Sequence, residues 1–228
     1  MRYEIEGESA FPIIKIWLNK GESVKAESGS MVALSSGLEL VGKIEGGIGK
    51  AFGRLFSGES FFMQTIEAVD SDGWALLTTP VPGGIIPIEM DGTNELLVQK
   101  DGFVASTEGV SFSTKVQKLA RGFLSGEGFF IIKLGGKGTA FLSSYGSIYP
   151  IELKENETVL IDNGHLIAWD SYLDYKITKG AKSWVSSFTS GEGFACRFTG
   201  PGKVLVQTRS PKSFVHWLYP KLPIPDKN

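Results

Sequence analysis

The chain has one cysteine and two histidines in 228 residues, and these shortages exclude several kinds of site. A single cysteine cannot form an intramolecular disulfide framework or the paired-cysteine spacing of a zinc or redox site. Cys196 lies in an apolar run, so we expect it to be a small core residue. A cupin-type metal site needs several histidine and carboxylate ligands. With only His165 and His216 available, the sequence predicts no metal site and no cofactor.

The sequence also lacks a long hydrophobic run, a leader sequence and a large net charge. No uninterrupted apolar stretch approaches the roughly 18 residues that a membrane-spanning helix needs. The first four residues, Met-Arg-Tyr-Glu, do not have the basic-then-apolar order of a signal peptide. The net charge of −2 argues against a strongly electrostatic nucleic-acid-binding protein. We therefore expect a cytoplasmic protein, with nucleic acid the least favoured partner.

Glycine, by contrast, is abundant. The chain has 29 glycines in 228 residues, well above the usual glycine share of about 7%. They stand as isolated residues between short apolar runs, a distribution typical of tight turns joining short strands. Hydrophobic residues make up 42% of the chain and charged residues 21%, which is an ordinary globular balance. The composition therefore favours a chain that folds mainly as β-strands.

One short phrase occurs three times. Ser-Gly-Glu-Ser-Phe stands at residues 57–61, and Ser-Gly-Glu-Gly-Phe stands at 125–129 and again at 190–194. Near-equal spacing of one phrase indicates a triplicated structural unit. The predicted repeats cover about 12–86, 87–149 and 150–220 of a single domain, followed by a tail at 221–228.

Each copy of the phrase follows two kinds of apolar pattern. Alternating apolar and polar residues, as in Leu38-Glu39-Leu40, predict a strand with one buried face. Apolar residues at helical spacing come next and predict a short helix in each copy, over about 48–56, 116–124 and 181–188. The phrase glycines Gly58, Gly126 and Gly191 are suited to end these helices.

A strand, a turn and a second strand are predicted to follow each phrase. The turns are expected at Asp72-Gly73, at Gly138 and at Gly202, because glycine accepts the backbone conformations that tight turns require. The next strands should then begin directly after these turns. Each unit would contain four or five strands and one helix.

The chain resembles the AIM24 family, also described as domain of unknown function 124. The best signature is the glycine-rich segment 46–56, Gly-Gly-Ile-Gly-Lys-Ala-Phe-Gly-Arg-Leu-Phe, which runs directly into the first phrase. The resemblance extends from about Tyr3 to about Pro220. It implies an all-β fold: a triplicated double-stranded β-helix, or barrel-like domain, with pseudo-threefold symmetry and units similar to the tryptophan RNA-binding attenuation protein. It brings no catalytic residues, and the eukaryotic branch is associated with organisation of the mitochondrial inner membrane.

The three phrase glutamates are the main candidates for a charged site. Pseudo-threefold symmetry could bring Glu59, Glu127 and Glu192 around one axis, where repulsion would raise their pKa values or attract a cation. The favoured interpretation is that each carboxylate accepts backbone hydrogen bonds in the loop after its helix. Neither a Gly-x-Ser-x-Gly elbow nor a phosphate-binding loop is present. We therefore predict no catalytic, cofactor-binding or metal-binding residues.

The sequence favours a non-catalytic scaffold or interaction protein that self-associates, and it predicts no enzyme. Apolar residues in the segment 214–219, which has no copy earlier in the chain, support a homo-oligomer or a protein partner. A membrane surface is a further candidate partner, because Lys50 and Arg54 lie on an amphipathic stretch and the end of the chain is rich in aromatic residues. Two alternatives stay open: a small-molecule-binding or hydrolytic β-helix enzyme, and RNA binding by fold analogy.

Overall fold

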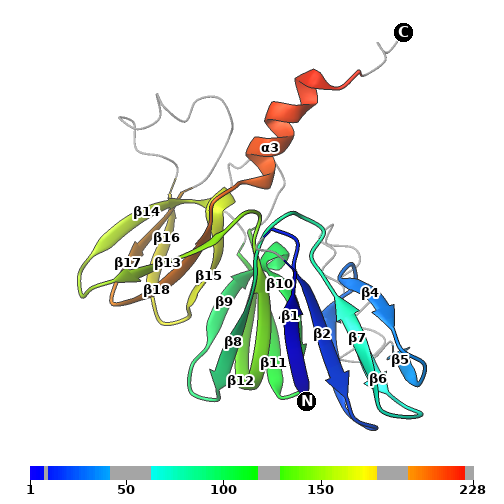
Figure 1. Ribbon diagram of the computed structural model, residues 1–228. Helices are drawn as coiled ribbons and strands as arrows, with labels where there is room; N and C mark the ends of the chain where they lie inside the picture. The colour runs from blue at the N-terminus through cyan, green and yellow to red at the C-terminus, as the bar shows by residue number, and fades with distance from the viewer. Residues whose placement is uncertain (8–9, 42–62, 118–128, 179–194, 224–228) are drawn as a thin grey trace.

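Strands dominate the computed structural model, which describes residues 1–7, 10–41, 63–117, 129–178 and 195–223 (Figure 1). The prediction of an all-β protein is confirmed, although the described strands form open antiparallel sheets and not a closed barrel. The predicted helices at about 48–56 and 181–188 and the three phrase glutamates lie outside the described residues, and so does most of the helix predicted over 116–124. Its predicted first residues, Val116 and Gln117, lie instead at the end of a strand, where they pair with Phe130 and Phe129.

The first stretch of chain forms two small groups of antiparallel strands. Strand β7 lies between β2 and β4, and strand β6 lies between β3 and β5. An N-terminal strand, β1 (Arg2–Glu6), adds to the free side of β2. The other bounds are β2 (Ile13–Leu18), β3 (Ser23–Glu27), β4 (Met31–Leu34), β5 (Leu38–Val41), β6 (Met63–Ala68) and β7 (Gly73–Leu77).

The same four pairings occur in the last stretch. Strand β18 lies between β13 and β15, and strand β17 lies between β14 and β16. A short 3-10 helix, η2 (Asn163–His165), precedes β15. The strand bounds are β13 (Ile148–Leu153), β14 (Thr158–Asp162), β15 (Leu166–Asp170), β16 (Asp174–Thr178), β17 (Ala195–Thr199) and β18 (Gly202–Gln207).

In the middle stretch a single long strand takes the place of two. The first half of β12 lies between β9 and β11, and its second half lies between β8 and β10. A 3-10 helix, η1 (Lys100–Gly102), precedes β10. The strand bounds are β8 (Ile85–Asp91), β9 (Leu96–Gln99), β10 (Phe103–Thr107), β11 (Val110–Gln117) and β12 (Phe129–Ser143).

The turn predicted at Gly138 is therefore wrong, because β12 runs through it without a break. Two glycines with positive φ, Gly136 and Gly138, let the strand change partners there instead of reversing. A Cβ at Gly138 would overlap the Thr107 hydroxyl oxygen. Glycine thus serves a close approach between strands at this position, whereas strands do begin at Gly73 and Gly202 as the turn positions suggested.

Neighbouring stretches share their sheets through two further strand pairs. Strand β3 of the first stretch pairs with β10 of the middle one, with Ala26 opposite Ala105. Strand β9 of the middle stretch pairs with β15 of the last one, with Val98 opposite Ala168. The stretches consequently follow one another in space, with β13–β18 at one end and β4–β7 at the other (Figure 1).

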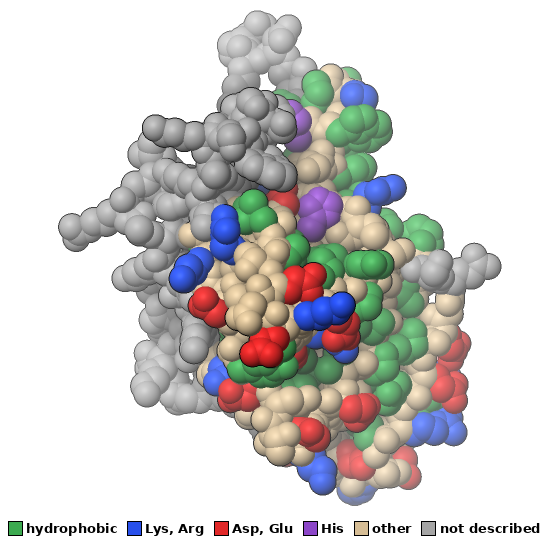
Figure 2. Space-filling model, turned by 90° about the vertical axis from the view of Figure 1, so that its left-hand side faces the viewer, with side chains coloured by type: hydrophobic (Ala, Val, Ile, Leu, Met, Phe, Trp, Pro, Cys, Tyr) green, Lys and Arg blue, Asp and Glu red, His purple; other side chains and the backbone are tan. Residues whose placement is uncertain are grey.

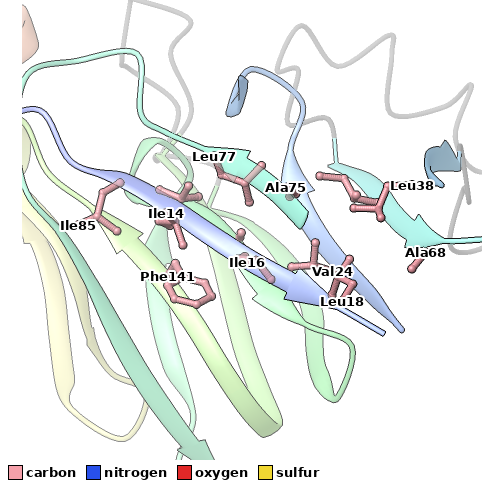
Figure 3. Packing of buried hydrophobic residues seen from close by; sticks show 14 residues of the cluster. Ile14, Ile16, Leu18, Val24, Leu38, Ala68, Ala75, Leu77, Ile85 and Phe141 are labelled. Atoms are coloured by element: carbon pink, nitrogen blue, oxygen red, sulfur yellow. The ribbon is translucent and has the colours of Figure 1, made fainter. Parts of the chain in front are cut away.

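Side chains from these sheets form three buried clusters. The first is built on alternating strands such as β2, where Ile14, Ile16 and Leu18 point inward while the residues between them are partly exposed. Figure 3 shows this cluster, with Phe141 of β12 facing Ile14. The other two clusters lie in the middle and last stretches, and the last one is centred on the buried Trp169 and Phe198.

Candidate interaction surface

The most conspicuous exposed feature is the helix α3 (Pro211–Leu218), which projects from the sheets near the chain end (Figure 1). Its start is set locally: the Ser213 backbone N–H donates to the Ser210 Oγ at 3.4 Å, and Pro211 occupies the first helical position. The helix continues into η3 (Tyr219–Lys221). The aromatic residues here were expected from the sequence, but the helix was not predicted, although the Ser210-Pro211 pair could have indicated its start.

None of the residues of α3 is buried, although half of them are large and apolar. We call the side chains of Phe214, Val215, Trp217 and Tyr219 the α3 face; all four are exposed. The Phe214 ring stacks on Trp217 with centroids 5.9 Å apart and meets the Tyr145 ring edge-on at 5.8 Å. Hydrophobic side chains gather at the top of the molecule in Figure 2, the height at which α3 lies in Figure 1. Exposed apolar side chains gathered on one projecting helix are typical of an interaction site.

The charged side chains in the chain segment that contains α3 have one sign. The described residues 209–223 include Arg209, Lys212 and Lys221 and no carboxylate side chain. The Lys221 Nζ lies 4.7 Å from the centre of the Trp217 ring and donates to the Trp217 carbonyl oxygen at 3.1 Å. The face thus combines aromatic rings with cations, which suits contact with an apolar or an anionic surface.

A cavity of about 450 Å³ lies between the middle and last stretches. Its polar groups come from Asn94, Asp170 and Lys203. The Asp170 Oδ2 already accepts hydrogen bonds from the Lys203 backbone N–H at 2.7 Å and from the Tyr172 hydroxyl at 3.0 Å. The hydrogen bond that Tyr172 donates to Asp170 raises the pKa of Tyr172. The remaining lining is apolar: Ile86, Ile88, Leu96, Ile148, Pro150, Trp169 and Leu205. The cavity could hold a small apolar molecule, but its lining carries no nucleophile paired with a base.

The two histidines lie on different elements of the structure. His165 lies in η2, where its Nδ1 donates to the Gln207 carbonyl oxygen at 2.7 Å. His216 is exposed on α3. Among the described residues, no three His, Cys, Asp or Glu side chains gather closely enough to hold a metal ion. Cys196 is fully buried, as predicted, and burial raises the pKa of its thiol to about 12.

Of the two segments that the sequence offered for contact with a membrane surface, one lies among the described residues. The amphipathic stretch that carries Lys50 and Arg54 lies outside the described residues, whereas the aromatic segment 214–219 is exposed. None of the helices in the described part of the chain is both long enough and apolar enough to span a membrane.

Comparisons with known proteins agree with the resemblance noted in the sequence. The sequence model of the AIM24 family, described as "Mitochondrial biogenesis AIM24", matches residues 3–209 and so ends just before α3. An uncharacterized protein of Streptococcus pyogenes serotype M6, M6_Spy0233, is 33% identical over 231 residues, covering 98% of this chain and 92% of the relative. The crystal structure of the S. pyogenes protein SPYM3_0169 is 31% identical, with a TM-score of 0.80 over 97% of this chain and 99% of that one. The chain belongs to the AIM24 family.

Proposed function

We propose that this protein is a non-catalytic scaffold that self-associates, with the α3 face as one of its contact surfaces. The exposed aromatic cluster on α3 is the observation that carries this proposal. Covering one large apolar side chain gains roughly 1.5–3 kcal/mol, so an uncovered face of several such side chains favours association. We propose a second copy of the chain as the occupant, because α3 projects from the sheets with its apolar side chains exposed, where another copy can cover them (Figure 1).

Light scattering on the purified full chain tests the proposal. We expect a mass that is a multiple of 24.7 kDa, and we expect Trp217→Ala to lower it at equal protein concentration. The matched control is Tyr149→Ala, since Tyr149 is a similarly exposed aromatic residue that lies on β13 and not on α3. A wild-type mass of one chain at every concentration would overturn self-association. A mass unaffected by Trp217→Ala would remove α3 from the contact.

The charge around α3 favours a second candidate partner, an anionic membrane surface. Aromatic rings on α3, Lys221 beside the Trp217 ring, and Arg209 and Lys212 with no carboxylate in residues 209–223 suit a helix that lies in the lipid headgroup region. We expect the chain to sediment with phosphatidylserine vesicles at low salt, to release at high salt, and to stay in solution with phosphatidylcholine vesicles. Failure to sediment with the anionic vesicles would remove this candidate.

We also propose that the stretches 12–86, 87–149 and 150–220 are three copies of one unit. The support is the recurrence of four strand pairings in each stretch, together with the matching phrase in the sequence. In this scheme β4, β10 and β15 occupy one position, and β3, β9 and β14 occupy another. Neighbouring units are then joined in the same way each time. Strand β3 of the first unit pairs with β10 of the second, and β9 of the second unit pairs with β15 of the third.

A further inference from the structure

Two strands of the described sheets lack the neighbour that their counterparts have. Strand β10 pairs with both β12 and β3, and strand β15 pairs with both β18 and β9. Strand β4, in the same position of the first stretch, pairs within the described part of the chain only with β7. Strand β14, the counterpart of β3 and β9, pairs there only with β17. Within the described part of the chain, β4 and β14 therefore each have one strand edge that is unpaired, although the equivalent edges of the other units are paired with each other.

The exposure of β4 agrees with a missing neighbour. Val32 of β4 is 50% exposed, whereas the corresponding Val104 of β10 and Ile167 of β15 are 2% and 1% exposed. The residues on either side follow the same trend. Met31 of β4 is exposed, whereas the corresponding Phe103 and Leu166 are buried. Ala33 of β4 is half-buried, whereas the corresponding Ala105 and Ala168 are buried. Similar apolar residues are therefore covered in β10 and β15, which have a neighbour on both sides, and uncovered in β4, which pairs only with β7 among the described strands.

Strand β14 is likewise more exposed than its counterpart in the middle stretch. Leu160 is 41% exposed, and its counterpart Leu97 of β9 is 4% exposed. The Gly200 backbone N–H donates to the Glu157 carbonyl oxygen at 2.9 Å, which directs Glu157 toward β17. Because backbone groups alternate in direction along a strand, the N–H and C=O of Leu160 point away from β17, toward the uncovered side.

We infer that β14 of one copy pairs antiparallel with β4 of a second copy, and that this pairing is a second contact, beside the α3 face, by which the chain self-associates. Copying the registers of β3 with β10 and β9 with β15 places Ile161 opposite Ala33 and Leu160 opposite Leu34. Strands β4 and β14 stand at opposite ends of the molecule in Figure 1, so they cannot meet within one chain. The pairing joins β16-β17-β14 of one copy to β4-β7-β2-β1 of the next in a continuous sheet.

This inference rests on the proposed self-association, and a disulfide cross-link tests it separately. In a Cys196→Ala background, chains with Leu34→Cys are mixed with differently tagged chains with Leu160→Cys and oxidised mildly. Directly opposed residues of an antiparallel pair lie close enough for a disulfide, so we expect a linked dimer containing both tags. The matched control pairs the Leu34→Cys chain with a Leu40→Cys chain, because Leu40 is about as exposed as Leu160 but lies on β5. Links no more abundant than in this control, or links only between two Leu34→Cys chains, would overturn the inference.

A backbone substitution provides the second measurement. Leu160→Pro removes the outward N–H while leaving the bonds between β14 and β17, and we expect it to lower the light-scattering mass and to abolish the cross-link at a neighbouring position, Ala33→Cys with Ile161→Cys. Leu160→Thr keeps the N–H and should retain both, and an unchanged circular dichroism spectrum shows that each variant folds. If Leu160→Pro leaves the light-scattering mass of the oligomer unchanged and no cross-link forms, the pairing of β14 with β4 is overturned but self-association is not. A wild-type chain that is monomeric at all concentrations overturns the proposed self-association as well.

Discussion

At the scale of single residues, the core decides the chemistry of the one thiol in the chain. Cys196 stands on β17 between Ile161 of β14 and Ile177 of β16 and is fully buried. Burial, with a smaller contribution from the negative charge of Asp162, raises the pKa of this thiol from 9.0 to about 12. The thiolate is the reactive form of cysteine, so Cys196 is a packing residue in the folded protein.

The raised pKa predicts both slow reaction and a pH dependence of stability. Between pH 9 and pH 12 the unfolded chain loses the thiol proton while the folded chain keeps it, so the free energy of unfolding falls as pH rises, by at most about 1.4 kcal/mol per pH unit. We expect a thiol reagent at pH 8 to label Cys196 only as fast as the fold opens. Urea titrations between pH 8 and pH 11 should show a steeper loss in wild type than in Cys196→Ala, and equal slopes would contradict the prediction.

Adjacent glycines at the first junction between stretches provide a matched pair of substitutions. Gly83 forms a bridge with Gly146, and a Cβ at Gly83 would overlap the Ser144 carbonyl oxygen. We expect Gly83→Ala to destabilise the protein by about 1–3 kcal/mol through this overlap. Gly84→Ala is the control, because its Cβ would meet nothing closer than 3.6 Å. Urea unfolding measures both, and similar losses in the two variants would count against the overlap.

At the scale of elements, sequence periodicity located strands well and missed features that depend on distant partners. Alternation at Leu38-Glu39-Leu40 correctly located β5, but the predicted buried face holds only at Leu38, because Leu40 on the same face is 47% exposed. The prediction of a turn from glycine failed at Gly138, where a Cβ would collide with Thr107 of another strand, a contact that local sequence does not reveal. The aromatic segment 214–219 was predicted as a contact surface without its helix, because no buried face produces a helical pattern of core residues there.

The cap of α3 yields a prediction at this scale. Ser210 is buried and its Oγ accepts the hydrogen bond from the Ser213 N–H at the helix start. Ser210→Ala should destabilise the helix by about 1 kcal/mol, which we expect to see as faster hydrogen exchange over residues 213–218. Ser213→Ala, at an exposed position of the same helix, is the control. Unchanged exchange in Ser210→Ala would show that the helix does not depend on its cap.

At the scale of the whole molecule, β12 ties the three buried clusters together. Phe141 belongs to the first cluster, Leu142 to the second and Ile131 to the third, and all three lie on this one strand. The sheets add to this linkage, since β3 pairs with β10 and β9 pairs with β15. We therefore expect the stretches to lose structure together and not one at a time.

A substitution in one cluster should consequently be felt in another. Phe141→Leu removes ring atoms from the first cluster and should cost about 1–3 kcal/mol. Hydrogen exchange at β15, around Trp169 in the third cluster, should speed up by a factor similar to that at β2, around Ile16. Exchange that accelerates at β2 alone would show that the stretches open independently. Tyr149→Ala, at an exposed position, should change neither.

The difference between the two uncovered strands gives any assembly built from them a direction. Each copy has one β4 edge and one β14 edge, and they are not interchangeable, so a row of copies has two unlike ends. The bend between the first and last stretches then decides whether the row closes on itself or continues as a filament (Figure 1). The number of copies in the assembly is thereby determined by an angle within each chain and not by the strength of the contact between chains.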